Sequence, residues 1–205
     1  MFLISCVSTK PQEETKDYEI VSTEESFPYI DCKMSYPQFL DQSLSKLNSG
    51  IKSFAEKEYK MYKDEAKTEF TDPRNPAPRK YSYELTALDV GKAKSMRSVI
   101  LKTESYTGGA HYSQTLKSFN FDSSTEKEIS VTAATGMSLK EISAEARKLL
   151  VSQGLDSGMV MEGTGPYEKN FSNFTISEKT VTIYFEPYQV ASYADGIRKV
   201  TITRK

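Results

Sequence analysis

A proline-rich segment divides this 205-residue chain into two parts with different hydrophobic periods. The segment TDPRNPAPRK, residues 71–80, contains three prolines. It cannot lie inside a helix, because proline lacks the backbone N–H and clashes with the preceding turn. Before the segment apolar residues recur every three or four positions, and after it they alternate with polar ones. We therefore expect a helix on one side of residues 71–80 and a sheet on the other.

The stretch from Tyr36 to Phe70 is predicted to form an amphipathic helix. Its apolar residues are spaced for a single buried stripe, and Glu, Lys and Ser fill the other positions. A break is expected near Gly50, because glycine has a low helix propensity. Residues 18–36 precede this helix and are predicted to form extended segments interrupted near Pro28. The stripe consists of Leu40, Leu44, Leu47, Ile51 and Phe54.

Three runs rich in Tyr, Phe, Val and Thr follow the proline segment at hairpin spacing. We expect Gly91 to close the first turn and the pair Gly108-Gly109 to lie in the second, because glycine adopts the backbone angles that tight turns require. This pattern predicts an antiparallel meander. The three runs are residues 81–90, 95–106 and 112–122.

The C-terminal part adds one helix and further strands. Ser138 and Glu141 have the spacing of a capping box, which predicts a helix from there to about Ser152, ended by Gly154. A loop-rich connection follows over residues 151–170. Later runs predict a hairpin across Glu178-Lys179 and a last strand; they are residues 173–188 and 196–203.

Strands and helices do not alternate regularly along the chain, so we predict the α+β class, with two main helices packed on an antiparallel sheet. The expected division has three parts. They are a tether over residues 1–17, a strand–helix subdomain over residues 18–75 and an antiparallel α+β domain over residues 76–205.

Charge and composition exclude several classes of function. The chain has 27 basic and 28 acidic residues, whereas nucleic-acid-binding domains carry a basic excess. Two cysteines and one histidine make neither a disulfide framework nor a Cys/His metal set. We therefore expect no nucleic acid, no metal and no cofactor. The 13 tyrosines suit half-buried sheet faces or a binding surface, because tyrosine joins an apolar ring to a polar tip.

The N-terminus predicts export. The sequence LISC, residues 3–6, resembles a bacterial lipobox, in which small residues precede a cysteine that becomes lipidated. Cys6 is then the lipidation site, residues 1–17 are a lipobox remnant with a flexible tether, and the signal sequence starts upstream. The alternative is a cytosolic protein with a short apolar N-terminus, in which a disulfide between Cys6 and Cys32 is conceivable.

The only histidine, His111, follows a glycine pair in SYTGGAHYSQ, residues 105–114. A phosphate loop requires a helix after the glycines, and the residues here favour a strand. A Ser-His-Asp triad stays open because its partners are distant in sequence, although G-x-S-x-G is absent. We interpret the stretch as a hairpin turn in which His111 begins the next strand and hydrogen-bonds inside the fold.

Two passages resemble the signatures of a bacterial envelope domain family of unknown function. They are YTGGAHYSQTLKSFNFD, residues 106–122, and YFEPYQVASYADGIRKVTI, residues 184–202. This family forms the C-terminal domain of a lysozyme-sensing anti-sigma factor and accompanies peptidoglycan deacetylase domains. A smaller partner domain usually precedes it, and residues 18–70 look similar to that domain. Tyr112 and Ser192 depart from the family pattern.

The resemblance implies a noncatalytic, extracytoplasmic and lipid-anchored domain that binds a protein or glycan, such as lysozyme or peptidoglycan fragments. The alternative is a cell-wall-directed hydrolase, or a deacetylase-associated protein, that uses His111. Separating the two requires replacing His111 with Ala and with Gln. The expected ligand- or partner-binding residues are Tyr106, His111, Pro187, Tyr188 and Tyr193. The expected structural turn residues are Gly108, Gly109 and Gly196.

Overall fold

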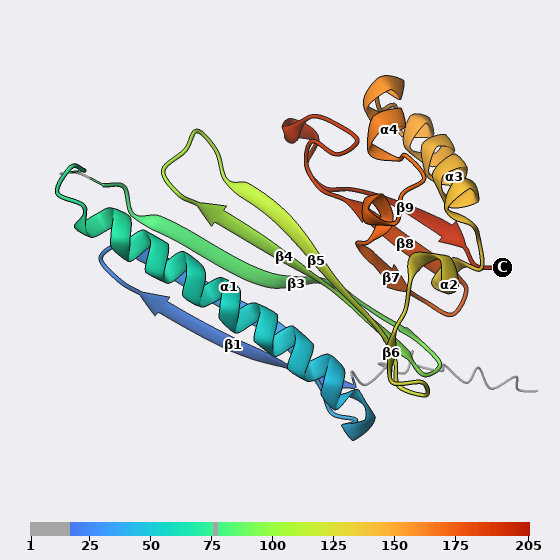
Figure 1. Cartoon of the computed structure of the whole chain (residues 1–205), viewed down its shortest axis with the longest axis horizontal. Helices are drawn as coiled ribbons and strands as arrows, with labels where there is room; N and C mark the ends of the chain where they lie inside the picture. Colours follow the sequence, from blue (N-terminus) through green and yellow to red (C-terminus); the bar gives the residue numbers. More distant parts are fainter. Residues whose placement is uncertain (1–16, 76–77) are drawn as a thin grey trace, which may run out of the picture.

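The chain forms two β-sheets and four α-helices in the part that the structure, a computed structural model, describes: residues 17–75 and 78–205 (Figure 1). The first sheet has six strands in the order β1–β2–β3–β4–β5–β6, and the second has three in the order β7–β8–β9. The predicted α+β class is confirmed. In the described residues, no helix combines the length and the apolar character needed to cross a membrane.

The elements alternate irregularly along the chain. The first sheet contains β1 (Tyr18–Ser26), β2 (Ile30–Phe39), β3 (Tyr81–Ala93), β4 (Met96–Tyr106), β5 (Ser113–Asp122) and β6 (Lys127–Glu128). The second contains β7 (Phe174–Ile176), β8 (Thr180–Phe185) and β9 (Arg198–Thr203). The helices are α1 (Ser45–Thr71), α2 (Val131–Thr135), α3 (Leu139–Ser152) and α4 (Ser157–Gly163). Three short 3₁₀ turns are η1 (Gln42–Leu44), η2 (Glu168–Phe171) and η3 (Tyr193–Asp195).

One strand pair of the first sheet is parallel. β2 pairs with β3 in parallel from Ile30 opposite Tyr81 to Met34 opposite Leu85, and every other recorded pair is antiparallel. The reason is α1, which carries the chain back along the sheet before β3 begins, as parallel neighbours require a long crossover. Strands before and after the proline segment therefore share one sheet, across the predicted division at residues 75 and 76.

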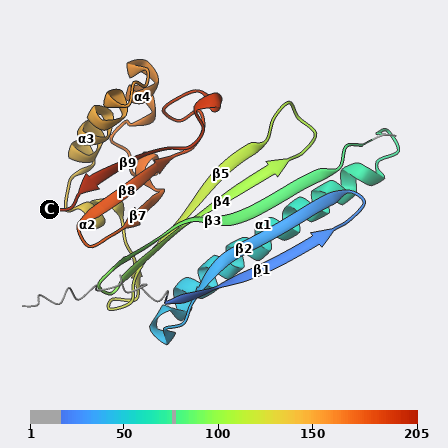
Figure 2. The same cartoon turned by 180° about the vertical axis from the view of Figure 1, so that it is seen from behind.

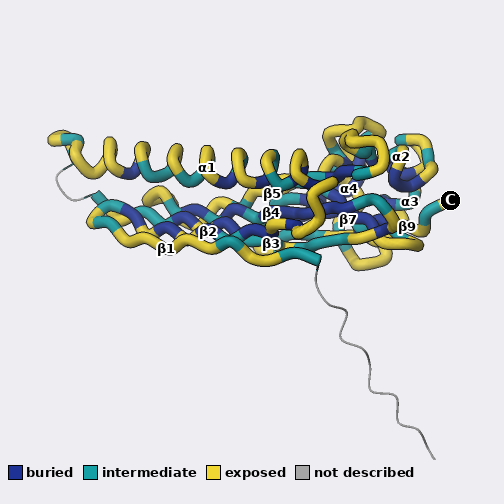
Figure 3. The backbone as a smooth tube through the Cα atoms, turned by 90° about the horizontal axis from the view of Figure 1, so that it is seen from below, coloured by how far each residue is buried: buried dark blue, intermediate teal, exposed yellow. Residues whose placement is uncertain are grey.

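Helix α1 lies along one face of the first sheet (Figure 3). Its buried residues include Leu47, Ile51 and Ala55, and its outer face is exposed. The buried residues of α1 pack in one hydrophobic core with inward residues of the strands, which include Tyr83 and Leu101. The opposite side of the helix is exposed, which accounts for its Lys- and Glu-rich sequence.

The predicted start of this helix at Tyr36 is wrong, because residues 36–39 belong to β2. The burial of β2 alternates, which is a strand pattern, and Leu40, assigned to the buried stripe, is 58% exposed. The expected break near Gly50 is also wrong. The helix runs straight through it because a buried apolar residue, Ile51, anchors that turn to the sheet.

Gly91 does not close a turn. It lies inside β3, which continues to Ala93, and the turn is formed by the next two residues, with Lys94 at a positive φ of 50°. A Cβ atom at Gly91 would lie 2.4 Å from the carbonyl oxygen of Ile176 and 2.4 Å from Ser98 Oγ. The glycine is therefore required by the close approach of β7 to the first sheet.

The central strand β4 is buried on both faces. Val99 and Leu101 point into the core under α1. Ser98 and Ile100 point to the other face, where Ser98 Oγ accepts a hydrogen bond from the Ile176 N–H at 2.8 Å. The second sheet therefore crosses the first on the face opposite α1, and α3 and α4 lie on the outside of the second sheet (Figure 2).

Asp89 joins the two sheets at an irregularity of β3. The register between β3 and β4 shifts at this point. The Asp89 carboxylate accepts hydrogen bonds from the Thr175 hydroxyl at 2.7 Å and from the Tyr184 hydroxyl at 2.5 Å. Burial and this bond raise the pKa of the Tyr184 phenol above its usual range. The bulge thus directs the Asp89 carboxylate away from the β3–β4 strand pair and toward the second sheet.

The predicted capping box and the helix that it opens are confirmed. Ser138 Oγ accepts from the Glu141 N–H, and the Glu141 carboxylate accepts from the Ser138 N–H at 2.8 Å. Ile142 and Ala146 are buried against the second sheet. Gly154, just beyond the helix end, has a positive φ of 83°.

The expected loop over residues 151–170 was wrong in part, because it contains α4. Asp156 caps this helix by accepting hydrogen bonds from the Gly158 and Met159 N–H groups at 2.9 and 3.1 Å. The composition of this segment did not predict a helix, because two of its seven residues are glycine. The predicted hairpin and last strand of this region are confirmed as β7–β8 and β9.

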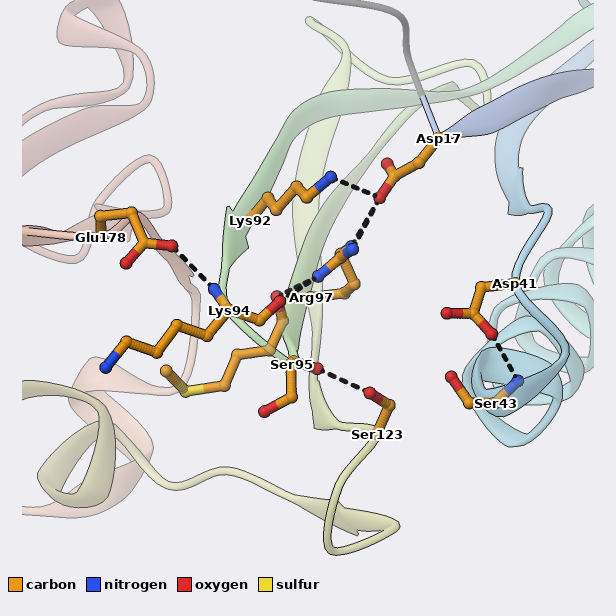
Figure 4. A network of polar contacts seen from close by, with 10 residues as sticks. Asp17, Asp41, Ser43, Lys92, Lys94, Ser95, Arg97, Ser123 and Glu178 are labelled. Atoms are coloured by element: carbon orange, nitrogen blue, oxygen red, sulfur yellow. Dashed lines mark hydrogen bonds and ion pairs between the residues drawn. The ribbon is translucent and has the colours of Figure 1, made fainter.

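The described chain begins at an ion-pair network (Figure 4). The Asp17 carboxylate lies 2.7 Å from the Arg97 guanidinium and 3.1 Å from Lys92 Nζ. The Arg97 side chain is largely buried and also donates to the carbonyl oxygens of Lys94 and Met96, both at 2.9 Å. The network fixes the start of β1 to the β3–β4 turn.

The two cysteines are not equivalent in the structure. The predicted lipidation site, Cys6, lies outside the described residues. Cys32 is a free, buried thiol in β2, and burial raises its pKa to about 11. Such a thiol is a poor nucleophile at neutral pH, since thiolate is the reactive form.

Candidate functional site

Two connections from different sheets lie at the same edge of the molecule. They are residues 107–112, between β4 and β5, and residues 186–197, between β8 and β9. Both stand at the top of the view in Figure 1. The Tyr193 hydroxyl donates to the Tyr112 carbonyl oxygen at 2.6 Å and links the two connections directly.

Five aromatic side chains meet at this edge, and we call them the aromatic cluster. The His111 ring stacks on Tyr193 with centroids 4.1 Å apart and an interplanar angle of 26°. Tyr188 lies 5.7 Å from Tyr193 on the outer side. Tyr106, the last residue of β4, lies 5.5 Å from Tyr112. The cluster consists of Tyr106, His111, Tyr112, Tyr188 and Tyr193.

The glycine pair shapes the first connection. Gly108 has a positive φ of 89°, with no other atom within 4 Å of the place where a Cβ would stand. Glycine is needed there for its backbone angle and not for space. At Gly109 only the His111 carbonyl oxygen lies within 4 Å of that place, at 3.9 Å. The connection then reverses the chain and brings His111 and Tyr112 back beside β4.

A short capped turn holds Tyr193. The Asp195 carboxylate accepts from the Ser192 hydroxyl at 2.7 Å and from the Ser192 N–H at 3.1 Å. The turn ends at Gly196, whose N–H donates to the Tyr193 carbonyl oxygen at 2.9 Å and whose φ is 65°. Both ends of η3 are therefore fixed by local hydrogen bonds, which sets the Tyr193 ring in place under His111.

Pro187 and Tyr188 form the outer turn of the second connection. The Gln189 N–H donates to the Glu186 carbonyl oxygen at 3.1 Å, so these two residues are the central pair of a β-turn. Proline suits the first central position, and the second has a positive φ of 70° at Tyr188. A tyrosine in this conformation costs about 1 kcal/mol, because its Cβ crowds the backbone. The turn leaves Tyr188 60% exposed to solvent.

His111 lies in the connection, outside β5, which begins at Ser113. Its Nδ1 atom lies 2.8 Å from the Tyr112 carbonyl oxygen, and the side chain is exposed. In the described part of the chain no carboxylate is recorded in hydrogen-bond contact with the imidazole. A histidine base in a triad has such an orienting partner, so the geometry around His111 is that of a surface aromatic residue.

The structure adds two residues to those predicted for the site. Tyr112 is 50% exposed and supplies the ring that connects Tyr106 to the rest of the cluster. Arg79 lies in the proline segment, and its guanidinium donates to the Tyr106 hydroxyl at 2.8 Å. This bond raises the pKa of Arg79 above its usual range. The departure of Tyr112 from the family pattern was the available signal, whereas nothing local to Arg79 indicated its position.

The residues that the structure describes include no group of three or more His, Cys, Asp or Glu side chains placed to hold a metal ion.

Two family models match the chain, one on each part. Residues 23–113 match the model described as Deacetylase PdaC. Residues 119–205 match the model described as Protein of unknown function (DUF3298). The two matches fall on different parts of the chain: residues 107–112 lie within the first match, and residues 186–197 lie within the second.

A relative in sequence is the peptidoglycan-N-acetylmuramic acid deacetylase PdaC of Bacillus subtilis (strain 168). It is 30% identical over 194 residues, which are 90% of this chain and 39% of that protein. The chain thus spans about two fifths of the length of this relative.

Two solved structures share the fold. One is a member of the DUF3298 family from Bacteroides fragilis, with a TM-score of 0.58 and 17% identity over 93% of this chain and 92% of that one. The other is a DUF3298 family protein from Pseudomonas aeruginosa PAO1, with a TM-score of 0.61 and 16% identity over 91% and 89%.

Proposed function

We propose that this protein is a noncatalytic binding domain for the glycan chains of the bacterial cell wall, with the aromatic cluster as its binding surface. The observation that carries the proposal is the meeting of five aromatic side chains, from the end of β4 and from two loops, at one exposed edge. Loops on a rigid scaffold are where binding residues gather, and tyrosine is a rigid anchor with few rotatable bonds.

Sugar chemistry suits this surface. A pyranose presents C–H groups on its faces and hydroxyl groups on its rim, so that an aromatic ring can cover a face while tyrosine hydroxyls and backbone groups bind the rim. Among the tyrosines of the cluster, Tyr112 and Tyr188 are the most exposed, at 50% and 60%. The relative in B. subtilis is named for action on peptidoglycan, which supports a cell-wall glycan as the ligand.

The noncatalytic character is proposed from the setting of His111. Its imidazole is exposed and contacts a backbone carbonyl oxygen and an aromatic ring. Among the described residues no carboxylate is recorded beside it to stabilise an imidazolium, as the aspartate of a triad does. The competing hypothesis is a hydrolase, or a deacetylase-associated protein, that uses His111. Release of acetate or of sugar reducing ends that is lost in both His111→Ala and His111→Gln would establish that hypothesis instead.

The test of binding is co-sedimentation of the full chain with purified peptidoglycan. The double variant Tyr188→Ala, Tyr193→Ala should bind at least about tenfold more weakly, because it removes two of the five rings of the surface. Tyr167→Ala is the matched control, since Tyr167 is 63% exposed and has no ring contact with the cluster. Equal binding by the double variant and the control would overturn the proposal.

Lysozyme belongs in the same experiment as a protein ligand, because the family resemblance implies it. Retention of lysozyme on the immobilised chain, lost in the double variant, would place a protein on the aromatic cluster. Retention that is unchanged in the double variant would place lysozyme elsewhere on the molecule.

We also propose that the domain is extracytoplasmic and anchored through a lipid on Cys6, on the basis of the LISC sequence. Labelling of cells with an alkyne-bearing fatty acid tests this. The label should appear on the protein expressed from its complete reading frame and vanish in Cys6→Ser. A protein that is exported but unlabelled would contradict the anchor while leaving the glycan proposal intact.

A further inference from the structure

We propose that the aromatic cluster selects glycans that carry carboxylate groups and that Arg79 binds the carboxylate. This inference rests on the proposed function and names the class of glycan: a hexosamine chain with acidic substituents, in preference to a neutral one such as chitin.

The first argument is position. Arg79 lies immediately before β3, and its Nη1 donates to the Tyr106 hydroxyl at 2.8 Å. Tyr106 in turn contacts the ring of Tyr112, which is held by Tyr193. A continuous row therefore runs from a guanidinium at one end to the exposed Tyr188 ring at the other.

The second argument is charge. Three basic side chains near the cluster are paired: Lys80 with Asp31 at 2.6 Å, Lys102 with Glu104, and Arg198 with Asp195. Glu186, in the second connection, accepts a hydrogen bond from the Leu116 N–H at 2.6 Å. Arg79 is exposed, and among the residues that the structure describes no carboxylate lies within ion-pair distance of it. Arg79 thus brings a positive charge with no recorded ion pair to one end of the row, and Glu186 lies in the other connection.

The third argument is the geometry of the guanidinium. Arginine has five N–H donors in a rigid plane, and the bond to Tyr106 uses one of them. The others can bind the two oxygens of a carboxylate in parallel, which neither water nor a sugar hydroxyl matches in strength. Because Tyr106 fixes the side chain beside the rings, little conformational freedom is lost when the carboxylate binds.

The test compares three soluble glycans of equal length on the full chain by isothermal titration calorimetry. They are a peptidoglycan tetrasaccharide that retains its lactyl carboxylates, the same tetrasaccharide with those carboxylates converted to methyl amides, and chitotetraose. The unmodified chain should bind the acidic glycan about three- to tenfold more tightly than either neutral one. The preference should shrink as salt concentration rises, because the arginine is exposed.

Two variants separate this inference from the proposed function. Arg79→Gln should bind all three glycans with the affinity that the unmodified chain shows for the amide, whereas Arg74→Gln, an exposed arginine of the same segment paired with Asp72, should keep the preference. Equal affinity of the unmodified chain for acidic and neutral glycans overturns the role of Arg79 and leaves the binding function standing. Absence of binding to all three overturns the proposed function itself.

Discussion

The Tyr193 hydroxyl donates a hydrogen bond to the Tyr112 carbonyl oxygen at 2.6 Å, across 81 positions of the chain. This bond joins a loop of the first sheet to a loop of the second. The aromatic cluster therefore exists only when both sheets are folded and docked, and neither loop could present the surface alone.

Replacing Tyr193 with Phe removes this bond and keeps the ring. We expect a loss of about 1 kcal/mol in the free energy of unfolding, because the bond is exposed and the freed carbonyl can bind water. Amide hydrogen exchange over residues 107–112 should become faster, since the link to the second sheet is gone. Tyr167→Phe, which alters an exposed tyrosine elsewhere, should change neither measurement. Unchanged exchange over residues 107–112 in Tyr193→Phe would show that the bond does not hold the loop.

Gly91→Ala should be severely destabilising. The added Cβ would stand 2.4 Å from the Ile176 carbonyl oxygen, a backbone atom that cannot move without shifting β7. We expect a loss of at least about 3 kcal/mol by urea denaturation, or a failure to fold, as for other overpacked core sites. Gly109→Ala is the matched control, because its Cβ would meet only the His111 carbonyl oxygen at 3.9 Å. Similar stabilities for the two variants would mean that the sheets do not approach so closely at Gly91.

The charge on Glu141 should make stability depend on pH in the acid range. Its hydrogen bond from Lys205, followed by those from Ser138, lowers the pKa of Glu141 from its ordinary value of 4.5 to about 2. A carboxyl whose folded pKa is depressed contributes stability above its unfolded pKa and loses that contribution as pH falls towards the folded pKa. Thermal unfolding should therefore show a higher Tm for the unmodified chain than for Glu141→Gln at about pH 7. The difference should shrink as the pH falls from about 4.5 to about 2. A difference of the same size throughout would assign the effect to packing of the side chain.

Local signals predicted the elements that depend on local chemistry. The Ser138–Glu141 capping box gave the start of α3, because the two hydrogen bonds form between residues three positions apart. Alternation predicted the β4 and β5 runs, and composition gave the turn at Gly108. The candidate residues Tyr106, His111, Tyr188 and Tyr193 also meet in space. They came from a family pattern, which records tertiary contacts that periodicity does not.

Features that depend on distant contacts were missed or misassigned. Periodicity gave α1 but not its start, because β2 ends in apolar residues that can extend a helical stripe equally well. Gly91 looked like a turn residue, since the strand that excludes a side chain there is β7, more than 80 positions later. Arg79 adjoins the aromatic cluster through its hydrogen bond to Tyr106, across 27 positions of the chain. The parallel pairing of β2 with β3 likewise depends on where the crossover helix packs.

The ion pair between Asp17 and Arg97 lies at the opposite end of β4 from the aromatic cluster. Arg97 is the second residue of β4 and Tyr106 is its last, so about 30 Å of strand separates the Asp17 ion pair from the aromatic cluster. The Asp17 carboxylate is held there by a guanidinium that also donates to two backbone carbonyl oxygens. The first described residue and the aromatic cluster therefore lie at opposite ends of β4, so that the cluster occupies the end of the first sheet remote from Asp17.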